Sequence, residues 1–300
     1  CGSCGHSCRG GACLNGHCQP VAIAELQGDP ADVVLDTDHV YWTASSDGTV
    51  NRVPKLGGMV KVLATGQNQP KGILVDEGYV YWSNTTNVGS IRRTPIDNPV
   101  APLPVVASEY YPYRMVIQGA KLYYTSDSST GHIGVVDKVG GVPSEVAMSQ
   151  NAPRGIAADA TRLYWTVFGE IRRLPLGATM PIVKNSSSEQ FPFDLKADAT
   201  TLFWSDGYAS KIRASLKTAT DEATTIADVG FGNRPVQIAV QGDSVFWANP
   251  EGRSIQSVAK TGGAVKTWIT EQKKPVGIGV DDTYIFWTTT GDGKVWRLAR

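Results

Sequence analysis

The sequence predicts an all-β fold made of a repeated unit, on three observations. Its 300 residues include 32 Gly and 17 Pro among many Val, Thr, Trp and Tyr, which is typical of short strands and turns. No stretch keeps an apolar helical period for about 12 residues, so helix should be nearly absent. Seven times along the chain, a proline is followed twelve residues later by the second member of an aromatic pair.

The aromatic pairs recur every 39 to 43 residues. The seven prolines are Pro30, Pro70, Pro112, Pro153, Pro192, Pro235 and Pro275. The pairs are Tyr41-Trp42, Tyr81-Trp82, Tyr123-Tyr124, Tyr164-Trp165, Phe203-Trp204, Phe246-Trp247 and Phe286-Trp287. Fourteen of the 26 aromatic residues lie in these pairs, so the period is not an accident of composition and defines seven units.

Each unit reads as four short strands separated by turn residues. In the second unit Glu77-Gly78 and Gly89 mark turns, and the strands are residues 72–76, 80–83, 91–95 and 103–107. Four strands repeated at about 40–45 residues are typical of a propeller blade. We therefore predict a seven-bladed β-propeller over residues 21–300, preceded by a short disulfide-rich segment, residues 1–20.

The two ends of the repeat predict how the ring closes. The last unit stops after its third strand, residues 294–298, and has no fourth strand of its own. Residues 21–24 have the pattern of a fourth strand and end six residues before Pro30. Residues 21–26 should therefore complete the seventh blade, which would remove an exposed sheet edge.

The repeated motif resembles that of YWTD propellers. The resemblance rests on Tyr41-Trp42-Thr43-Ala44, Tyr164-Trp165-Thr166-Val167 and Phe203-Trp204-Ser205-Asp206. The preceding Pro-x-Gly-Ile-x-x-Asp, at 70–76 and 153–159, is similar to both YWTD and NHL repeats. The likeness covers residues 21–300, but YWTD propellers typically have six blades, and the final Asp is kept only at Asp206. It implies an extracellular binding platform without naming a ligand, since related propellers include lyases and lactonases.

Most repeated residues are expected to be structural. The two rings of each aromatic pair should point to opposite faces of a middle strand and pack against both neighbouring blades. A carboxylate at one turn position should accept backbone N–H groups, and it recurs at Asp36, Asp76, Asp159, Asp198 and Asp281. Gln118 and Gln241 take that position in two other units.

Charge and motifs exclude several classes of function. The chain has 28 basic and 28 acidic residues, so no nucleic-acid partner is expected. Its longest apolar runs are four or five residues, so no transmembrane segment is expected either. The sequence lacks a Gly-x-Ser-x-Gly elbow, a phosphate-cradling Gly loop and His-Glu-x-x-His. These absences favour a protein without catalysis or cofactor.

All five cysteines lie in the first 18 residues, at Cys1, Cys4, Cys8, Cys13 and Cys18. A segment with so little apolar content is usually held by disulfides, which predicts an extracellular or cell-envelope location. A c-type haem is disfavoured because Gly5 stands between the Cys1–Cys4 pair and His6. Zinc remains an alternative, with ligands drawn from Cys4, His6, Cys8, Cys13 and Cys18.

The odd number of cysteines leaves one residue over. Two disulfides of unknown connectivity are expected among Cys4, Cys8, Cys13 and Cys18. Cys1 is then either the lipid-bearing first residue of an outer-membrane-anchored lipoprotein or the partner of a cysteine upstream or in another chain. The segment resembles the second half of small Cys-rich modules that precede propellers in secreted bacterial proteins.

A candidate ligand site follows from the positions where the blades differ. The segments before each first strand and the loops between second and third strands should gather on one rim, the upper face. Over blades 3–6 this rim carries eight aromatic residues that a solvent-facing loop does not normally expose. The predicted binding residues are Tyr110, Tyr111, Tyr113, Arg114, Phe168, Phe191, Phe193, Tyr208, Phe231 and Arg234. They suit a protein or glycan partner, unless the loops fold over and bury the rings together.

A second candidate is a metal site at the mouth of the channel. Two residues beyond three of the repeated prolines stand Asp32, Asp194 and Gln237, whose oxygens can bind Ca²⁺ or Mg²⁺. The resemblance to lactonase-like propellers points the same way, whereas Arg114 at the corresponding position of blade 3 opposes a cation.

Three functions follow, of which the first is favoured. The chain is a non-catalytic binding propeller that recognises a protein or glycan through the aromatic residues of its upper face. Alternatively, it is a metal-assisted hydrolase or lyase at the channel mouth, or a structural subunit of a cell-surface assembly linked through the Cys-rich segment.

Overall fold

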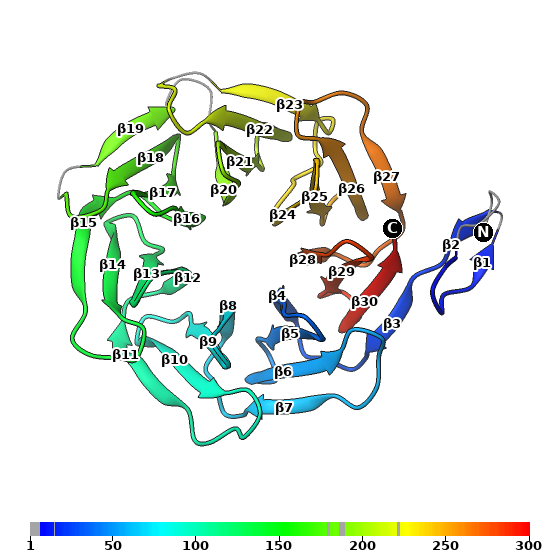
Figure 1. The fold of residues 1–300 in the computed structure, drawn as a ribbon, viewed down its shortest axis with the longest axis horizontal. Coiled ribbons are helices and arrows are strands. Elements are labelled where there is room, and N and C mark those ends of the chain that lie inside the picture. The colour runs from blue at the N-terminus through cyan, green and yellow to red at the C-terminus, as the bar shows by residue number, and fades with distance from the viewer. Residues whose placement is uncertain (1–6, 15, 179–180, 186–189, 221–222) are drawn as a thin grey trace.

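The protein is a ring of seven four-stranded antiparallel sheets around a central axis (Figure 1). The computed structural model describes residues 7–14, 16–178, 181–185, 190–220 and 223–300. These residues contain strands, turns and loops but no helix, and hence no helix long and apolar enough to cross a membrane. The predicted all-β seven-bladed propeller is confirmed.

In blades 1–6 the strands follow the chain from the innermost to the outermost position, whereas the outermost strand of blade 7 comes from the N-terminal part of the chain. Blade 1 consists of β4 (Pro30–Leu35), β5 (His39–Ala44), β6 (Thr49–Pro54) and β7 (Lys61–Ala64). Blade 2 consists of β8 (Pro70–Asp76), β9 (Tyr79–Asn84), β10 (Gly89–Pro95) and β11 (Leu103–Glu109). Blade 3 consists of β12 (Pro112–Gln118), β13 (Lys121–Ser126), β14 (Gly131–Asp137) and β15 (Ser144–Gln150).

The remaining blades repeat this order. Blade 4 consists of β16 (Ile156–Ala158), β17 (Arg162–Val167), β18 (Glu170–Pro175) and β19 (Ile182–Asn185). Blade 5 consists of β20 (Pro192–Ala197), β21 (Thr201–Asp206), β22 (Lys211–Leu216) and β23 (Thr224–Asp228). Blade 6 consists of β24 (Ile238–Gln241), β25 (Ser244–Asn249), β26 (Ser254–Ala259) and β27 (Lys266–Ile269). Blade 7 consists of β28 (Pro275–Val280), β29 (Tyr284–Thr289), β30 (Lys294–Ala299) and the N-terminal strand β3 (Val21–Ala24).

The seventh blade closes the ring as predicted. Strand β3 pairs antiparallel with β30, and Ala22 lies opposite Trp296. Ile23 and Ala24 are buried in the same cluster as Trp42 of blade 1 and Val295 of blade 7. The chain thus joins its first and last segments through both sheet hydrogen bonds and core packing.

The aromatic pairs fill the spaces between blades. Tyr41 packs on the side of blade 2, whereas Trp42 packs on the side of blade 7, and both are fully buried. The hydroxyl that follows the pair links one blade to the next. Thr43 Oγ1 donates to the Lys71 carbonyl at 2.6 Å, and Ser83 Oγ donates to the Tyr113 carbonyl at 2.7 Å.

The repeated aspartates make the predicted turns in four of five blades. Asp36 Oδ1 accepts the N–H groups of Asp38 and His39 at 2.8 and 2.7 Å. The same arrangement recurs at Asp159, Asp198 and Asp281. Asp76 differs because a two-residue turn follows it, and its carboxylate binds Lys138 of blade 3 at 2.7 Å.

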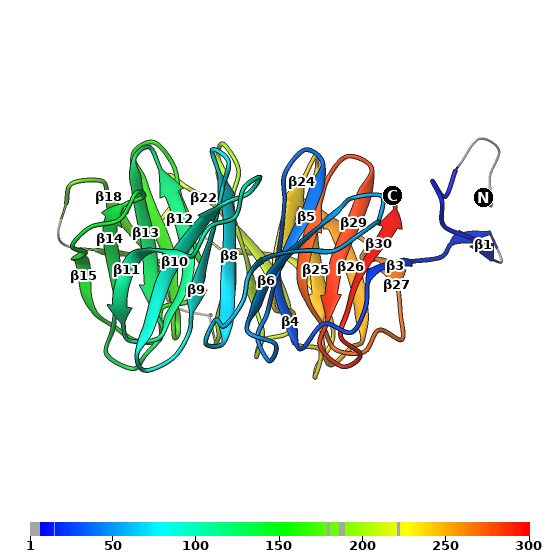
Figure 2. The same cartoon turned by 90° about the horizontal axis from the view of Figure 1, so that it is seen from below.

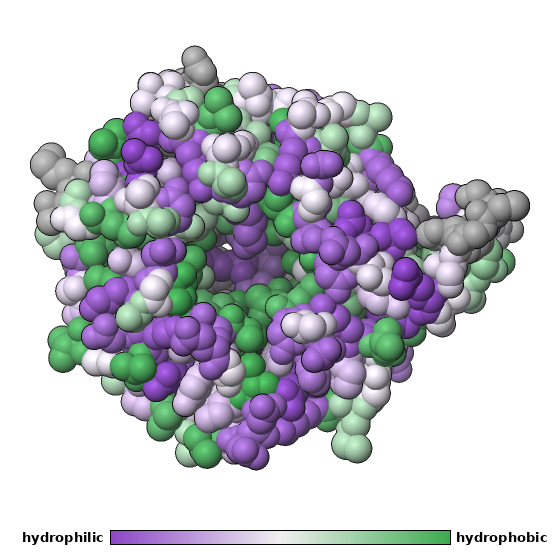
Figure 3. Space-filling model, in the orientation of Figure 1, coloured by the Kyte–Doolittle hydropathy of each residue, from purple (hydrophilic) through white to green (hydrophobic). Residues whose placement is uncertain are grey.

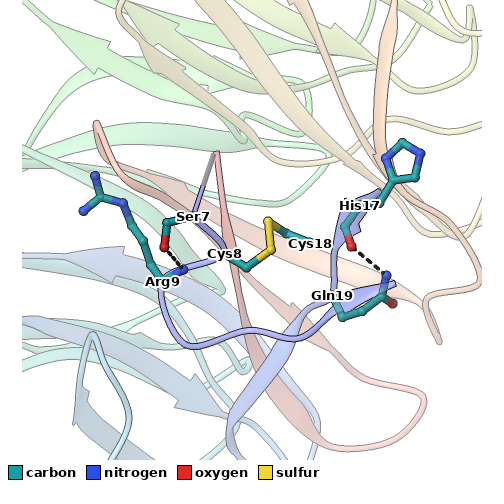
Figure 4. Close-up of a disulfide and its surroundings, with 6 residues drawn as sticks. All are labelled: Ser7, Cys8, Arg9, His17, Cys18 and Gln19. Carbon is teal, nitrogen blue, oxygen red and sulfur yellow. Dashed lines mark hydrogen bonds between the residues drawn. A yellow bond between two sulfur atoms is a disulfide. The ribbon is translucent and has the colours of Figure 1, made fainter. Parts of the chain in front are cut away.

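The N-terminal segment stands outside the ring beside blade 7 (Figure 2). It contains the short hairpin β1 (Cys13–Leu14) and β2 (His17–Cys18) and a disulfide between Cys8 and Cys18 (Figure 4). Cys18 packs against the apolar cluster of blades 6 and 7, and Cys13 is also disulfide-bonded. The predicted roles of Cys1, Cys4 and His6 lie outside the described residues.

Candidate functional site

A buried polar group crosses the central channel where the innermost strands converge. Arg114 Nη1 on β12 forms an ion pair with Asp32 Oδ2 on β4. The amide of Gln237 completes the group when its Nε2 donates to Asp32 Oδ1 at 2.9 Å and its Oε1 accepts from Arg114 Nη2 at 2.7 Å. All three residues are at most 9% exposed. We call Asp32, Arg114 and Gln237 the channel plug.

Asp194 lies beside the plug with partners of its own. Its Oδ2 accepts the Ile238 N–H at 3.0 Å, and its Oδ1 accepts from Lys196 Nζ at 3.3 Å. Burial acts to raise the pKa of Asp194, but Lys196, Arg114 and the Ile238 N–H together bring it below its usual value. Asp194 is therefore an ionised, fully partnered carboxylate.

The plug does not fit the predicted Ca²⁺ or Mg²⁺ site. Both Asp32 oxygens are engaged, Oδ1 by the Val33 N–H and Gln237 and Oδ2 by the Ile73 N–H and Arg114. Within the described ranges no three His, Cys, Asp or Glu side chains are grouped as metal ligands. The Arg114 guanidinium supplies the positive charge that a divalent cation would bring.

Two cavities meet at the plug. The larger one, about 840 Å³, is lined by Tyr113 and Phe193 on one side and by the blade 1 and 2 residues Asp47, Gln69 and Lys71 on the other. The smaller one, about 380 Å³, lies further along the inner strands. Asp32, Arg114 and Gln237 line both cavities, so the plug lies where the two cavities meet. The space-filling view shows the ring hollowed at its centre (Figure 3).

Five of the eight predicted aromatic residues form one network on the upper face. The ring centroids of Tyr113 and Phe193 lie 6.3 Å apart, and those of Phe193 and Phe191 lie 6.4 Å apart. Phe191 also contacts Phe168 at 6.2 Å and Tyr208 at 4.8 Å. We call these five residues the aromatic rim. Because Tyr113 and Phe193 also line the larger cavity, the rim is continuous with the channel mouth.

Two arginines lie over the rings of the rim. The Arg154 Cζ is 4.6 Å from the Phe191 centroid and 5.2 Å from the Phe193 centroid. Its Nε is 3.0 Å from Asp127 Oδ2. The Arg234 Cζ is 4.8 Å from the centroid of Tyr208. Both guanidinium groups thus lie within cation–π distance of aromatic rings.

The other predicted rim residues lie outside the network. Tyr110 and Tyr111 contact each other at 4.7 Å, edge to face. Phe231 is completely exposed at the tip of the loop between β23 and β24. It stands between Gly230 and Gly232, whose φ angles of 81° and 87° favour glycine. Arg114 belongs to the plug, although its guanidinium also lies 5.5 Å from the Tyr113 ring.

Asp206 supports the rim and was not among the predicted site residues. It is fully buried, and its carboxylate accepts N–H groups from Gln190 at 2.9 Å, Phe191 at 3.0 Å and Ala209 at 3.2 Å. These bonds hold the loop that carries Phe191 against the hairpin that carries Tyr208. The sequence contained a signal, because Asp206 alone keeps the last residue of the YWTD-like motif.

Comparison with solved structures identifies the fold. A catalytically inactive virginiamycin B lyase from Staphylococcus aureus with quinupristin is 16% identical over 94% of this chain and 98% of its own, with a TM-score of 0.78. The WD40 propeller domain of Doa1 is 15% identical over 94% and 97%, with a TM-score of 0.77. A chain of a nidogen/laminin complex is 16% identical over 74% and 89%, with a TM-score of 0.61. No family model and no curated protein sequence matches the chain. These similarities support the propeller fold only.

Proposed function

We propose that the chain is a non-catalytic binding propeller with YWTD-like repeats, located outside the cell or in its envelope. It recognises a protein or glycan partner through the aromatic rim and needs no cofactor. The Cys8–Cys18 disulfide supports the extracellular location, because disulfides persist in oxidising compartments.

The exposure of the rim is the observation that carries this proposal. Phe168 is 54% exposed and Tyr208 is 48% exposed, although both contact Phe191. Rings of a satellite core under folded loops would be buried like the paired aromatics, thirteen of which are nearly inaccessible. A connected group of rings beside a cavity, two of them half exposed, is typical of a surface that a ligand covers.

The alternatives have less support in the site. Propellers of the lyase class share the fold at 14–16% identity, which carries no activity across. At the channel mouth, the metal-assisted hydrolase or lyase would need ligands that the plug already uses. An assembly role through the N-terminal segment depends on Cys1, which lies outside the described residues.

The test compares two double variants that truncate exposed apolar side chains on opposite faces of the ring. Phe168→Ala/Tyr208→Ala removes half-exposed rings of the rim, and Leu56→Ala/Met59→Ala removes exposed side chains from the β6–β7 connection on the opposite face. A glycan array and a displayed random-peptide library serve as probes for the immobilised full chain. We expect the rim variant to keep its melting temperature and to lose affinity by more than about tenfold for binders of the parent chain. Equal binding by both variants would disprove the proposal.

A further inference from the structure

The ligand class follows from how the arginines occupy the aromatic rim. This inference rests on the proposed function and deepens it. A sugar ring stacks on an open aromatic face, but Arg154 covers one face of both Phe191 and Phe193. Arg234 covers a face of Tyr208. The rim therefore presents guanidinium groups beside its rings rather than aromatic faces alone.

A guanidinium packed over a ring can still bind a carboxylate through two of its N–H groups. Its N–H groups point sideways in the plane, where they match the two oxygens of a carboxylate. Arg234 is exposed and, in the part of the chain that the structure describes, has no ion pair with a carboxylate. The Arg154 guanidinium donates from Nε to Asp127, and its Nη groups donate no hydrogen bond found among the described residues. Both groups thus have donors left for a ligand.

Apolar contacts adjoin both cations. Half-exposed Tyr208 lies under Arg234, and half-exposed Phe168 lies against Phe191 next to Arg154. Fully exposed Phe231 stands three residues before Arg234 on the same loop. A partner that places a carboxylate beside an apolar side chain would satisfy cation and ring at once.

We propose that the aromatic rim binds an acidic peptide segment of a partner protein, in which Asp or Glu stands next to apolar residues. Arg234 and Arg154 bind the carboxylates, and Phe168, Tyr208 and Phe231 contact the apolar side chains. The segment runs from blade 6 across blade 5 toward Tyr113 at the channel mouth. Charge pairing also selects against basic segments.

Selection from a random-peptide library on the full chain tests this directly. We expect the selected peptides to be enriched in Asp and Glu beside Leu, Ile or Phe. Synthetic copies in which Asn and Gln replace the acids should bind roughly tenfold more weakly or worse. Raising NaCl from about 50 to about 300 mM should lower the affinity for the acidic peptides and leave the affinity for the amide copies unchanged.

Variants separate this proposal from the proposed function. Arg234→Gln should lower the affinity for the acidic peptides roughly tenfold. Arg154→Lys keeps the positive charge but lacks the planar guanidinium, so it should also lower this affinity. Lys121→Gln, which removes one positive charge on the opposite face, should have no effect. Binders that require Phe168 and Tyr208 but ignore both arginines, or that are sulfated or neutral glycans only, would overturn the acidic-peptide assignment and leave the proposed function intact. Selection of no binder to the rim would overturn both.

Discussion

The indole Nε1 of Trp82 donates a hydrogen bond to Oε1 of Gln67 at 2.9 Å, fifteen residues earlier in the chain. The same spacing recurs for Trp42 with Gln27, Trp165 with Gln150 and Trp287 with Gln272. In blade 3 both partners change, and Tyr124 donates its hydroxyl proton to Glu109 at 2.6 Å. In each of these blades, the segment before the first strand therefore supplies the hydrogen-bond acceptor for the buried N–H or O–H group of the aromatic pair.

Replacing Gln67 should destabilise the ring at blade 2. Gln67→Leu leaves the Trp82 indole N–H without an acceptor and removes one from Asn84 Nδ2. An unsatisfied buried donor costs about 1–3 kcal/mol, so the free energy of unfolding in denaturant should fall by that amount. Asn68→Leu, at an exposed neighbouring position, is the control and should change it little. Equal unfolding midpoints for the two variants would argue against the indole cap.

Truncating Ile23 should weaken the closure of the ring. The side chain is 6% exposed in a cluster shared by blades 1 and 7. Ile23→Ala should cost about 2–5 kcal/mol through lost burial and the cavity left behind. Leu26→Ala, at a 93% exposed position just beyond β3, should cost almost nothing. If chemical denaturation gives the same stability for both variants, strand β3 does not hold the ring closed.

Removing Asp206 should impair the rim without removing any of its rings. Asp206→Ala leaves the N–H groups of Gln190, Phe191 and Ala209 without their acceptor, at a cost of about 1–3 kcal/mol. Amide hydrogen exchange at residues 190 and 191 should accelerate, and affinity for rim ligands should fall with it. Asp292→Ala in the blade 7 hairpin is the matched control. Unchanged exchange at these two amides would remove Asp206 from its positioning role.

The blade 3 cluster should make stability depend on pH. His132 Nε2 lies 3.3 Å from Glu109 Oε2, and its Nδ1 lies 3.7 Å from Glu145 Oε1. Partial burial acts to lower the pKa of His132, but the two carboxylates raise it above its usual 6.5. Burial acts to raise the pKa of Glu109, but hydrogen bonds from His132, Tyr124 and the Tyr110 N–H bring it below its usual 4.5.

The sign of each shift defines the pH window. A group whose pKa is raised in the folded state stabilises the protein below its unfolded-state pKa, and this stabilisation is lost as the pH rises through its folded-state pKa. A carboxyl group whose pKa is lowered in the folded state stabilises the protein above its unfolded-state pKa, and this stabilisation is lost in acid. His132→Gln should therefore lower the melting temperature most between about pH 4.5 and 6.5 and least near pH 9. A difference in melting temperature between parent and variant that is the same at about pH 5.5 and at about pH 9 would contradict the ion pair.

Much of the fold was predictable because its determinants are local and repeated. The second member of each aromatic pair stands twelve residues after its proline. Spacing alone therefore predicts the number of blades, the closure by residues 21–24 and most aspartate turns. Asp76 departed from the turn rule because Glu77-Gly78 forms a tighter turn. The pattern also placed the aromatic residues of the rim on one face.

The roles of individual rim residues depended on contacts between blades. Gln27 and Gln67 were not among the predicted functional residues, but folding brings their amides to buried indoles. Asp32 and Gln237 read as metal ligands, yet they surround Arg114, a partner 82 residues from Asp32 in the chain. The sequence by itself determined the seven-bladed scaffold, because its hydrophobic period is repeated in every blade. Only the tertiary structure decided which side chains plug the channel and which remain exposed, because those contacts join different blades and occur once each.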